Sequence, residues 1–164
     1  MTWPAYLILS LVTLQRLGEL VLAERNTRRL LARGAFEVGR GHYPVIVALH
    51  AVWLATLWVL GPGLPIHLVP LLLFVALQAA RAWVVTTLGE RWTTRIIILP
   101  CAPLVRAGPY RWVDHPNYLI VIGEIAVLPL VFGLPVVSLV FSLMNAGVLW
   151  IRIREENKAL TAAS

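Results

Sequence analysis

The stretch that decides the fold is Leu104-Val105-Arg106-Ala107-Gly108-Pro109-Tyr110-Arg111-Trp112-Val113-Asp114-His115-Pro116-Asn117-Tyr118-Leu119, a polar segment of a very apolar chain. Hydrophobic runs precede and follow it, and a further run leads to the charged segment Arg152-Ile153-Arg154-Glu155-Glu156. We expect the two polar segments to meet at the cytosolic face of a membrane and to hold a small charged cofactor. The apolar helices would then hold a lipid-like substrate against that cofactor.

Composition places the chain among membrane proteins. Of its 164 residues, 59% are hydrophobic and 13% are charged, whereas soluble domains average about half apolar and about a quarter charged residues. The mean hydropathy is +0.79. The net charge is +6, but the arginines lie in short blocks between apolar runs, as topology signals do, so nucleic acid is a poor explanation. The single cysteine, Cys101, excludes an internal disulfide and a cysteine-based metal cluster, and we expect no metal.

The hydrophobic runs predict an all-α, polytopic membrane protein with about five spanning helices in a single domain, residues 1–164. The predicted spans cover residues 3–23, 43–60, 66–87, 118–132 and 136–151. The first three are close to the length that crosses a bilayer. The last two are shorter and are expected to form a helical hairpin. The first run lacks a preceding basic segment and a small-residue cleavage site, so a retained helix is favoured over a signal peptide. Residues 88–117 are expected to form a polar cytosolic loop.

The positive charges predict the orientation of these spans. Lysine and arginine residues follow spans one, three and five, whereas the N-terminus and the other two turns carry none. The positive-inside rule then places the N-terminus outside and the C-terminus in the cytosol. The residues concerned are Arg25, Arg28, Arg29, Arg33, Arg40, Arg91, Arg95, Arg106, Arg111, Arg152, Arg154 and Lys158.

Polar side chains inside the predicted spans gather in the cytosolic half of the membrane. Buried ionisable groups are costly in a bilayer unless they are paired or hydrated, so they favour a functional interpretation. Groups at a similar depth on five helices predict one cavity that opens to the cytosol. The alternative is a set of structural pairs, with His50 as a satisfied core residue. The residues are Arg16, Glu19, His50, Gln78, Arg81, Glu124 and Asn145.

The charged tail continues one helix face. Asn145, Arg152, Glu155 and Glu156 recur at intervals that place them on a single stripe of a helix. A carboxylate pair there can accept hydrogen bonds from a ribose or an ammonium group. The alternative is a solvated helix end.

Taken together, these residues resemble the isoprenylcysteine carboxyl methyltransferase family of integral-membrane, S-adenosylmethionine-dependent enzymes. The N-terminal half is similar to a short bacterial-type branch, which includes enzymes that O-methylate long-chain alkylresorcinols and alkylpyrones. The family usually has arginine immediately before the His-Pro pair, whereas this chain has Asp114, so the anionic contact of that arginine is either absent here or made by Arg111. The resemblance rests on Leu88-Gly89-Glu90-Arg91-Trp92-Thr93, Gly108-Pro109-Tyr110-Arg111-Trp112-Val113, His115-Pro116-Asn117-Tyr118, Glu124, Leu128-Pro129-Leu130, Arg152, Glu155, Glu156 and Leu160, and in the N-terminal half on Arg16, Glu19, Arg25-Asn26, Gly34-Ala35, Glu37, His42-Tyr43-Pro44 and His50.

The resemblance implies that S-adenosylmethionine is the cofactor and that His115 and Tyr118 contact it. It implies that Glu155 and Glu156 hold the ribose or amino-acid end, and that Arg152 holds the carboxylate or a neighbouring glutamate. Turn chemistry with interfacial aromatic residues is the alternative explanation of the loop motifs. The implied cofactor-binding residues are Leu104, Val105, Tyr110, His115, Pro116, Tyr118, Arg152, Glu155 and Glu156.

The expected reaction is an in-line attack of an acceptor oxygen on the methyl carbon. A carboxylate acceptor needs only positioning, for which the expected substrate-binding residues are Arg16, Arg81, Gln78 and Asn145. A phenol, with a pKa near 10, benefits from a base. The candidates for this base, or catalytic residue, are Glu124, His50 and Glu19, and the sequence does not choose among them.

Two rival functions stay open. Some membrane sterol reductases are similar in the C-terminal region, including the His-Pro pair, but use NADPH; this chain is short for that role and has no glycine-rich phosphate motif. The second rival is a non-catalytic membrane module. The sequence does not separate prenylcysteine from lipid phenol acceptors, and it does not predict the oligomeric state.

Overall fold

The computed structural model describes residues 3–39, 41, 43–100 and 102–163, with side chains described as far as Glu156. Arg40, His42 and Cys101 lie outside the described residues, as do the side chains of Lys158 and Leu160. The structure is 75% helical. Its helices are α1 (Trp3–Ala32), α2 (Tyr43–Leu60), α3 (Leu68–Leu88), α4 (Pro116–Val131) and α5 (Pro135–Ala163), joined by the short 3-10 helices η1 (Gly89–Arg91) and η2 (Gly108–Arg111) and the strands β1 (Phe36–Val38) and β2 (Ile96–Ile98).

The helices are those of an integral membrane protein, which confirms the predicted all-α membrane fold. Helices α1, α2, α3 and α5 are long and apolar enough to cross a bilayer, and α4 is apolar but shorter. Their outward surfaces carry large aliphatic side chains, for example Val59 and Val69, each 78% exposed, and Val136, 72% exposed. Such a continuous apolar exterior is unusual for a soluble protein and suits contact with lipid.

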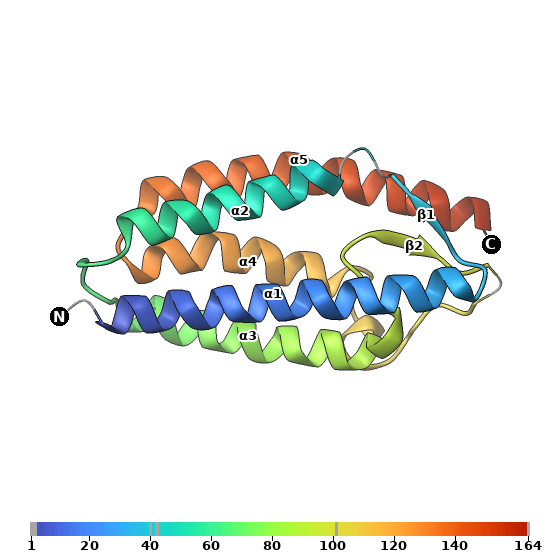
Figure 1. Ribbon diagram of the computed structural model, residues 1–164, viewed down its shortest axis with the longest axis horizontal. Helices are drawn as coiled ribbons and strands as arrows, with labels where there is room; N and C mark the ends of the chain where they lie inside the picture. The colour runs from blue at the N-terminus through green and yellow to red at the C-terminus, as the bar shows by residue number, and fades with distance from the viewer. Residues whose placement is uncertain (1–2, 40, 42, 101, 164) are drawn as a thin grey trace.

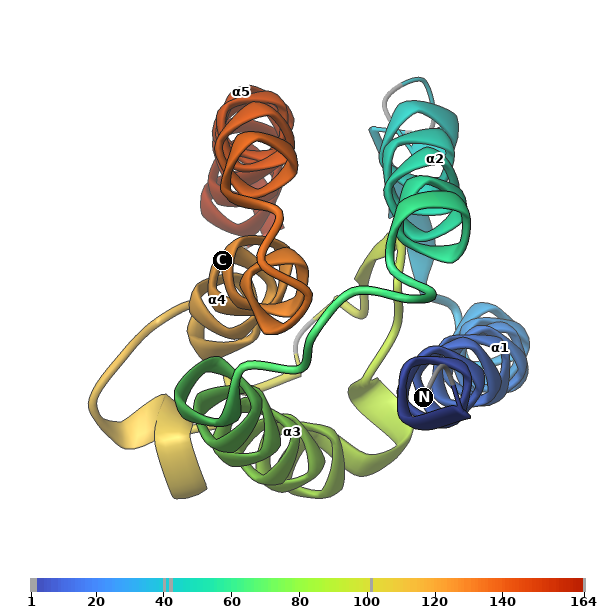
Figure 2. The same cartoon turned by 90° about the vertical axis from the view of Figure 1, so that its left-hand side faces the viewer.

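The helices run roughly side by side along the long axis of the molecule (Figure 1). The α2–α3 and α4–α5 turns and the N-terminus lie at one end, whereas both strands, the 3-10 helices and the C-terminus lie at the other. Helix α4 packs against α3 and α5, α5 also packs against α2, and α2 packs against α1 (Figure 2). We call the end with the strands the polar end.

Two clusters of buried side chains hold this arrangement together. The larger one reaches the tight turns and includes Leu57, Leu128 and Phe132, each at most 1% exposed. The smaller one lies near the polar end, where Trp92 packs with Val84 and neighbours from α1 and α4. The second cluster therefore fixes the loop after α3 against three helices.

Two of the helices extend beyond the predicted spans. Helix α1 continues past residue 23 to Ala32, and α5 continues past residue 151 to Ala163. Hydropathy predicts where the apolar run ends, but a helix can continue beyond that point when polar side chains one turn apart stabilise it. In α1, the Arg28 Nε donates to Glu24 Oε1 at 2.8 Å, one turn apart.

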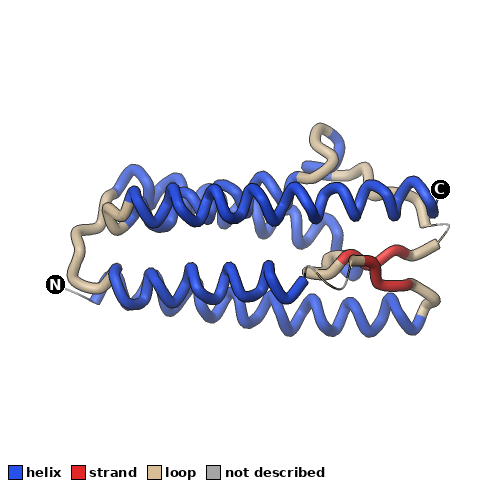
Figure 3. The backbone as a smooth tube through the Cα atoms, turned by 90° about the horizontal axis from the view of Figure 1, so that it is seen from above, coloured by secondary structure: helices blue, strands red, loops and turns tan. Residues whose placement is uncertain are grey.

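The strands were not expected from the sequence. Strand β1 pairs antiparallel with β2, so that Glu37 lies opposite Ile97 (Figure 3). The buried Asn26 of α1 reinforces this junction, because its Nδ2 donates to the Trp92 carbonyl at 2.8 Å and to the Gly89 carbonyl at 3.1 Å. These contacts tie α1 to the segment that follows α3 and so close the polar end.

Candidate functional site

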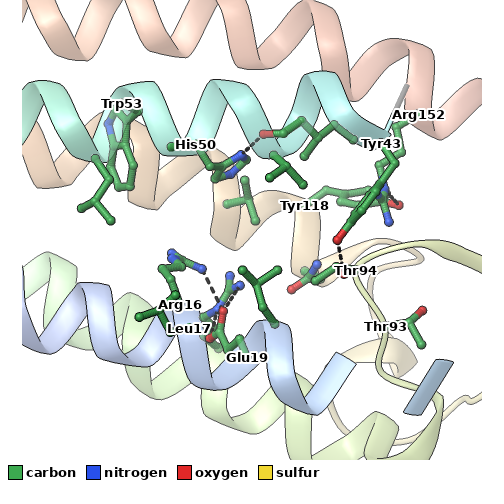
Figure 4. Close-up of a pocket in the computed structure, with 18 of the residues that line it drawn as sticks. Arg16, Leu17, Glu19, Tyr43, His50, Trp53, Thr93, Thr94, Tyr118 and Arg152 are labelled. Atoms are coloured by element: carbon green, nitrogen blue, oxygen red, sulfur yellow. Dashed lines mark hydrogen bonds and ion pairs between the residues drawn. The ribbon is translucent and has the colours of Figure 1, made fainter. Parts of the chain in front are cut away.

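A cavity of about 270 Å³ lies between the helices. Its walls come from α1, α2, α3, α4, α5 and the segment that follows η1 (Figure 4). One part of the wall is polar and lies toward the strands, and the remainder is mainly aliphatic. The lining residues include Arg16, Leu17, Glu19, Leu20, Tyr43, Val47, His50, Trp53, Arg81, Trp92, Thr94, Asn117, Tyr118 and Arg152.

Two arginines and two glutamates form a buried network beside the cavity. The Arg81 guanidinium donates from Nη2 to Glu19 Oε2 at 2.6 Å and from Nη1 to Glu124 Oε2 at 3.0 Å. Arg16 donates from Nη2 to Glu124 Oε2 at 2.7 Å and from Nη1 to Glu19 Oε2 at 3.1 Å. Gln78 completes the network through a 2.9 Å bond from Nε2 to Glu124 Oε1. Because arginine is always protonated, the two cations balance the two carboxylates.

The network brings together five of the residues that the sequence singled out, and it also limits what they can do. The Arg81 side chain is only 7% exposed and makes its bonds within the protein. Glu124 is 1% exposed and is absent from the cavity lining. The predicted substrate contacts of Arg16, Arg81 and Gln78 would therefore compete with these existing bonds. Asn145, 2% exposed, lies in α5 one turn before Leu149, which lines the cavity.

His50 stands apart from the network on the α2 wall. Its Nδ1 lies 2.8 Å from the Ile46 carbonyl oxygen, one helical turn earlier. A carbonyl only accepts hydrogen bonds, so Nδ1 must carry a hydrogen, and in the neutral ring Nε2 then presents a lone pair. The ring also packs edge-on to Trp53, with ring centroids 6.5 Å apart.

A second polar cluster joins the start of α4 to α5. The Tyr118 hydroxyl accepts a hydrogen bond from Arg152 Nε at 2.8 Å and donates one to Glu156. The His115 ring stacks on the Tyr118 ring, with centroids 5.2 Å apart and an interplanar angle of 21°. His115 Nδ1 also lies 4.0 Å from Glu156 Oε2. Because all four were predicted to contact the cofactor, we call them the cofactor cluster; Tyr118 and Arg152 line the cavity.

Tyr110 lies behind this cluster. It packs against the buried group that contains Trp92. Burial of the side chain raises the pKa of Tyr110 to about 12, and the negative charge of Glu156 adds to this effect. The phenol is therefore neutral at physiological pH and can donate a hydrogen bond.

The other predicted cofactor residues occupy less direct positions. Pro116 is buried at the first turn of α4, where its missing N–H costs nothing. Leu104 is 63% exposed and Val105 is half-buried, and both lie outside the cavity wall. Glu155 is half-buried on α5 next to Glu156.

Sequence reasoning missed several residues that line the cavity. The Tyr43 hydroxyl lies 3.1 Å from Thr94 Oγ1, which joins the start of α2 to the segment before β2. Asn117 and Trp92 also line the cavity, and their Oδ1 and Nε1 atoms are buried without a hydrogen-bond partner among the described residues. Tyr43, Trp92 and Asn117 all lie within motifs that the resemblance used, but nothing in those motifs indicated which way the side chains point.

Comparisons with known proteins bear on this region. Residues 69–162 match the model of the isoprenylcysteine carboxyl methyltransferase family. "Uncharacterized protein YpbQ" of Bacillus subtilis is 34% identical, over 94% of this chain and 95% of the relative. An "Uncharacterized protein" of Haemophilus influenzae is 26% identical, over 89% of this chain and 88% of the relative. No solved structure matches the chain significantly. The matched residues run from α3 to α5 and include the whole cofactor cluster.

Proposed function

Because this chain belongs to the isoprenylcysteine carboxyl methyltransferase family, we propose that it transfers a methyl group from S-adenosylmethionine to an oxygen atom of a lipophilic acceptor. Family membership indicates a membrane methyltransferase. The acceptor oxygen belongs to a carboxylate, as in isoprenylcysteine, or alternatively to the ring of a long-chain alkylresorcinol or alkylpyrone. Residues 1–164 act as one membrane-embedded domain, with the N-terminus outside and the polar end in the cytosol.

The observation that carries this proposal is the position of the cofactor cluster beside the cavity. Tyr118 and Arg152 belong both to the cluster and to the cavity wall. A charged cofactor held by the cluster from the cytosol would thus meet a hydrophobic acceptor held by the helices. This is the arrangement that transfer between a polar donor and a lipid requires.

The residues of the cluster suit the chemistry of S-adenosylmethionine. The Glu156 carboxylate can accept hydrogen bonds from a ribose or an ammonium group, and Arg152 can pair with a carboxylate. The Arg152 guanidinium carbon lies 5.6 Å from the Tyr118 ring centroid, so the positive charge of Arg152 also makes a cation–π contact with this ring.

The aliphatic wall suits the tail of a lipid. Leu17 and Leu20 of α1 and Val47 of α2 line the cavity, yet they are 54%, 41% and 38% exposed. They therefore face the cavity and the surroundings of the helices together. In a membrane those surroundings are lipid, so a hydrophobic acceptor can reach the cavity between α1 and α2 without crossing water.

The protein's part in the reaction is mainly alignment. The bound cofactor supplies an electrophilic methyl group on a positively charged sulfur. The cofactor cluster holds S-adenosylmethionine and the aliphatic wall holds the acceptor. Holding both in place removes much of the entropic cost of bringing the two reactants together. The surrounding helices exclude water, so electrostatic interactions within the site are stronger than in solution.

The cavity fits an NADPH-dependent reductase less well. A nucleotide phosphate needs cationic side chains that are free to bind it. In the described part of the chain, Arg16, Arg81 and Arg152 are the arginines of the cavity wall. Arg16 and Arg81 pair with the carboxylates of Glu19 and Glu124, whereas Arg152, within the same part of the chain, donates only from Nε, to the Tyr118 hydroxyl. A single available guanidinium suits the one carboxylate of S-adenosylmethionine better than the several phosphate groups of NADPH.

The test is methyl transfer in membranes that contain the protein. Methyl-labelled S-adenosylmethionine is added with either a farnesylated cysteine derivative or a long-chain alkylresorcinol, and the labelled lipid is extracted. Alkali releases methanol from a methyl ester but not from an aryl ether, so the product identifies the acceptor group. We expect label in one of the two lipids.

The matched variants are Glu156→Gln in the cofactor cluster and Glu90→Gln at the protein surface. Glu90 is 59% exposed and pairs with Arg29 and Arg33 outside the cavity. We expect Glu156→Gln to lower transfer strongly and Glu90→Gln to leave it unchanged. Wild-type membranes that label neither lipid, or equal loss in both variants, would contradict the proposed function.

A further inference from the structure

The two ring nitrogens of His50 differ in their hydrogen bonds. Buried polar atoms in proteins usually have a hydrogen-bond partner. Here Nδ1 is bound to the Ile46 carbonyl at 2.8 Å, whereas Nε2 has no hydrogen-bond partner among the described residues. The bond to Ile46 fixes both the tautomer and the ring plane, so the lone pair on Nε2 is held in one direction.

The ring belongs to the cavity wall. His50 lies on α2 between Ile46 and Leu54, which also line the cavity, and Figure 4 shows its ring between the α2 backbone and the Arg16–Glu19 side. It is half-buried, in contrast to the fully buried Trp53 next to it. A hydroxyl group in the cavity could therefore approach Nε2 directly.

The two carboxylates that could compete for this role are already occupied. Glu19 accepts from Gln15, Arg16 and Arg81, with at least one donor on each oxygen. Glu124 accepts from Gln78 on Oε1 and from two arginines on Oε2. A carboxylate must give up such charge-assisted bonds before it can take a proton, which makes it a weak base.

We propose that Nε2 of His50 is the general base that removes the hydroxyl proton of the acceptor. This inference rests on the proposed function and deepens it. The acceptor oxygen bonds to the methyl carbon as the methyl–sulfur bond breaks and leaves its electron pair on sulfur. The O–H bond breaks in the same step, and the proton moves to Nε2. One positive charge is lost at sulfur and one is gained as the imidazolium, so the step balances.

The charged groups around His50 are paired with one another. Arg16 and Glu19 from α1 and Arg81 from α3 line the same cavity, and Glu124 of α4 bonds to both arginines. The charges of these four groups sum to zero when all are ionised. Tyr43, Tyr118 and Arg152 line the cavity nearer the polar end. His50 therefore takes the proton beside arginines that are already paired with carboxylates.

A base is useful only for an acceptor that carries a proton, such as a phenol or an enol. A carboxylate is already ionised at neutral pH and needs only to be positioned. The action of His50 should therefore depend on the type of acceptor.

The first experiment compares His50→Gln with wild type and with His67→Gln. His67 is exposed and begins α3 at the opposite end of the molecule from the strands. For an alkylresorcinol acceptor, we expect His50→Gln to lower kcat by roughly 100- to 10,000-fold with little change in KM. The decline of the wild-type rate at acid pH should disappear, and added imidazole should partly restore transfer in His50→Ala. His67→Gln should behave as wild type.

The second measurement detects proton transfer without methyl transfer. Wild-type protein saturated with S-adenosylhomocysteine is mixed with a long-chain alkyl nitrophenol, whose anion is yellow. A bound base should produce the yellow anion at a pH where the free phenol is colourless, and His50→Gln should abolish this colour.

Wild-type kcat and pH dependence in His50→Gln, or a colourless bound probe in wild type, would overturn the assignment. Loss of activity in His50→Ala without rescue by imidazole, while the bound probe stays yellow in His50→Gln, would also overturn it. Failure of the wild type to bind S-adenosylhomocysteine would instead contradict the proposed function.

Discussion

At the scale of single residues, the Tyr118 hydroxyl is the centre of the cofactor cluster, because it joins Arg152 to Glu156. Tyr118→Phe keeps the ring that stacks on His115 and removes only these two bonds. Bonds to charged groups contribute about 1.5–3 kcal/mol each, so we predict at least about tenfold weaker binding of S-adenosylhomocysteine. Calorimetric titration of the detergent-solubilised protein measures this. Tyr6→Phe, on an exposed tyrosine of α1, is the control, and equal affinity of Tyr118→Phe and wild type would show that the cluster does not bind the cofactor.

Glu124 tests the buried charge network. Glu124→Gln removes a charge that two arginines share and leaves those cations partly uncompensated in a site that is 1% exposed. Breaking a buried ion pair costs about 3–5 kcal/mol, so we predict a large fall in the melting temperature of the solubilised protein. Glu24→Gln, whose carboxylate is 43% exposed, should change it little. A normal melting temperature for Glu124→Gln would mean that the network is not a structural requirement.

The sequence indicated most of these polar residues but not their pairing. Arg16 with Glu19 was predictable, because a spacing of three residues places both on one helix face. The bonds from Arg81 to Glu19 and to Glu124 join α1, α3 and α4, and hydropathy contains no information on which faces of separate helices meet. For the same reason the sequence left Glu124, His50 and Glu19 as equal candidates for the base.

At the scale of elements, η2 depends on a close approach to α3. Gly108 has φ of +53°, and a Cβ atom there would lie 2.6 Å from Thr87 Oγ1 and 3.1 Å from Trp83 Nε1. Gly108→Ala should therefore push η2 away from α3 and displace Tyr110 and the start of α4. We predict a loss of about 1–3 kcal/mol in stability, together with weaker binding of S-adenosylhomocysteine.

Gly18→Ala is the matched control for Gly108→Ala. Gly18 lies within α1, and a Cβ atom there would meet nothing within 4 Å. Alanine in a helix interior is favoured over glycine by roughly 0.5–1 kcal/mol, so this variant should be neutral or slightly more stable. Thermal unfolding of both variants in one detergent compares them. A Gly108→Ala protein as stable as Gly18→Ala would show that the contact between η2 and α3 is not tight.

The helices were more predictable than the strands. The span predicted at 43–60 coincides with α2, because an apolar run of membrane length bounded by Tyr43 and Gly61 has one reasonable interpretation. The pairing of β1 with β2 joins segments about sixty residues apart, each only three residues long. Runs this short carry no periodic signal, so the polar end looked like irregular loop.

At the scale of the whole molecule, we propose that the polar end faces the cytosol and the N-terminus lies outside. In a Cys101→Ser background, Leu64→Cys in the α2–α3 turn should react with a membrane-impermeant thiol reagent in intact cells. Trp112→Cys, at an exposed site of the polar end, should react only after the membrane is permeabilised. The reason is that the arginine-rich segments remain on the cytosolic side. The opposite pattern of labelling would place the cofactor cluster outside the cell and contradict the proposed cytosolic site.

The central claim is that the cofactor cluster binds S-adenosylmethionine, and ligand binding to the intact protein tests it most directly. The detergent-solubilised protein is heated with increasing S-adenosylhomocysteine and, separately, with NADPH. A ligand at about 100 times its Kd stabilises the folded state by roughly 2.7 kcal/mol, which is readily detected. We predict that S-adenosylhomocysteine raises the melting temperature and that NADPH does not. A rise with NADPH alone would favour the reductase, and no rise with either ligand would contradict a cofactor site at Tyr118, Arg152 and Glu156.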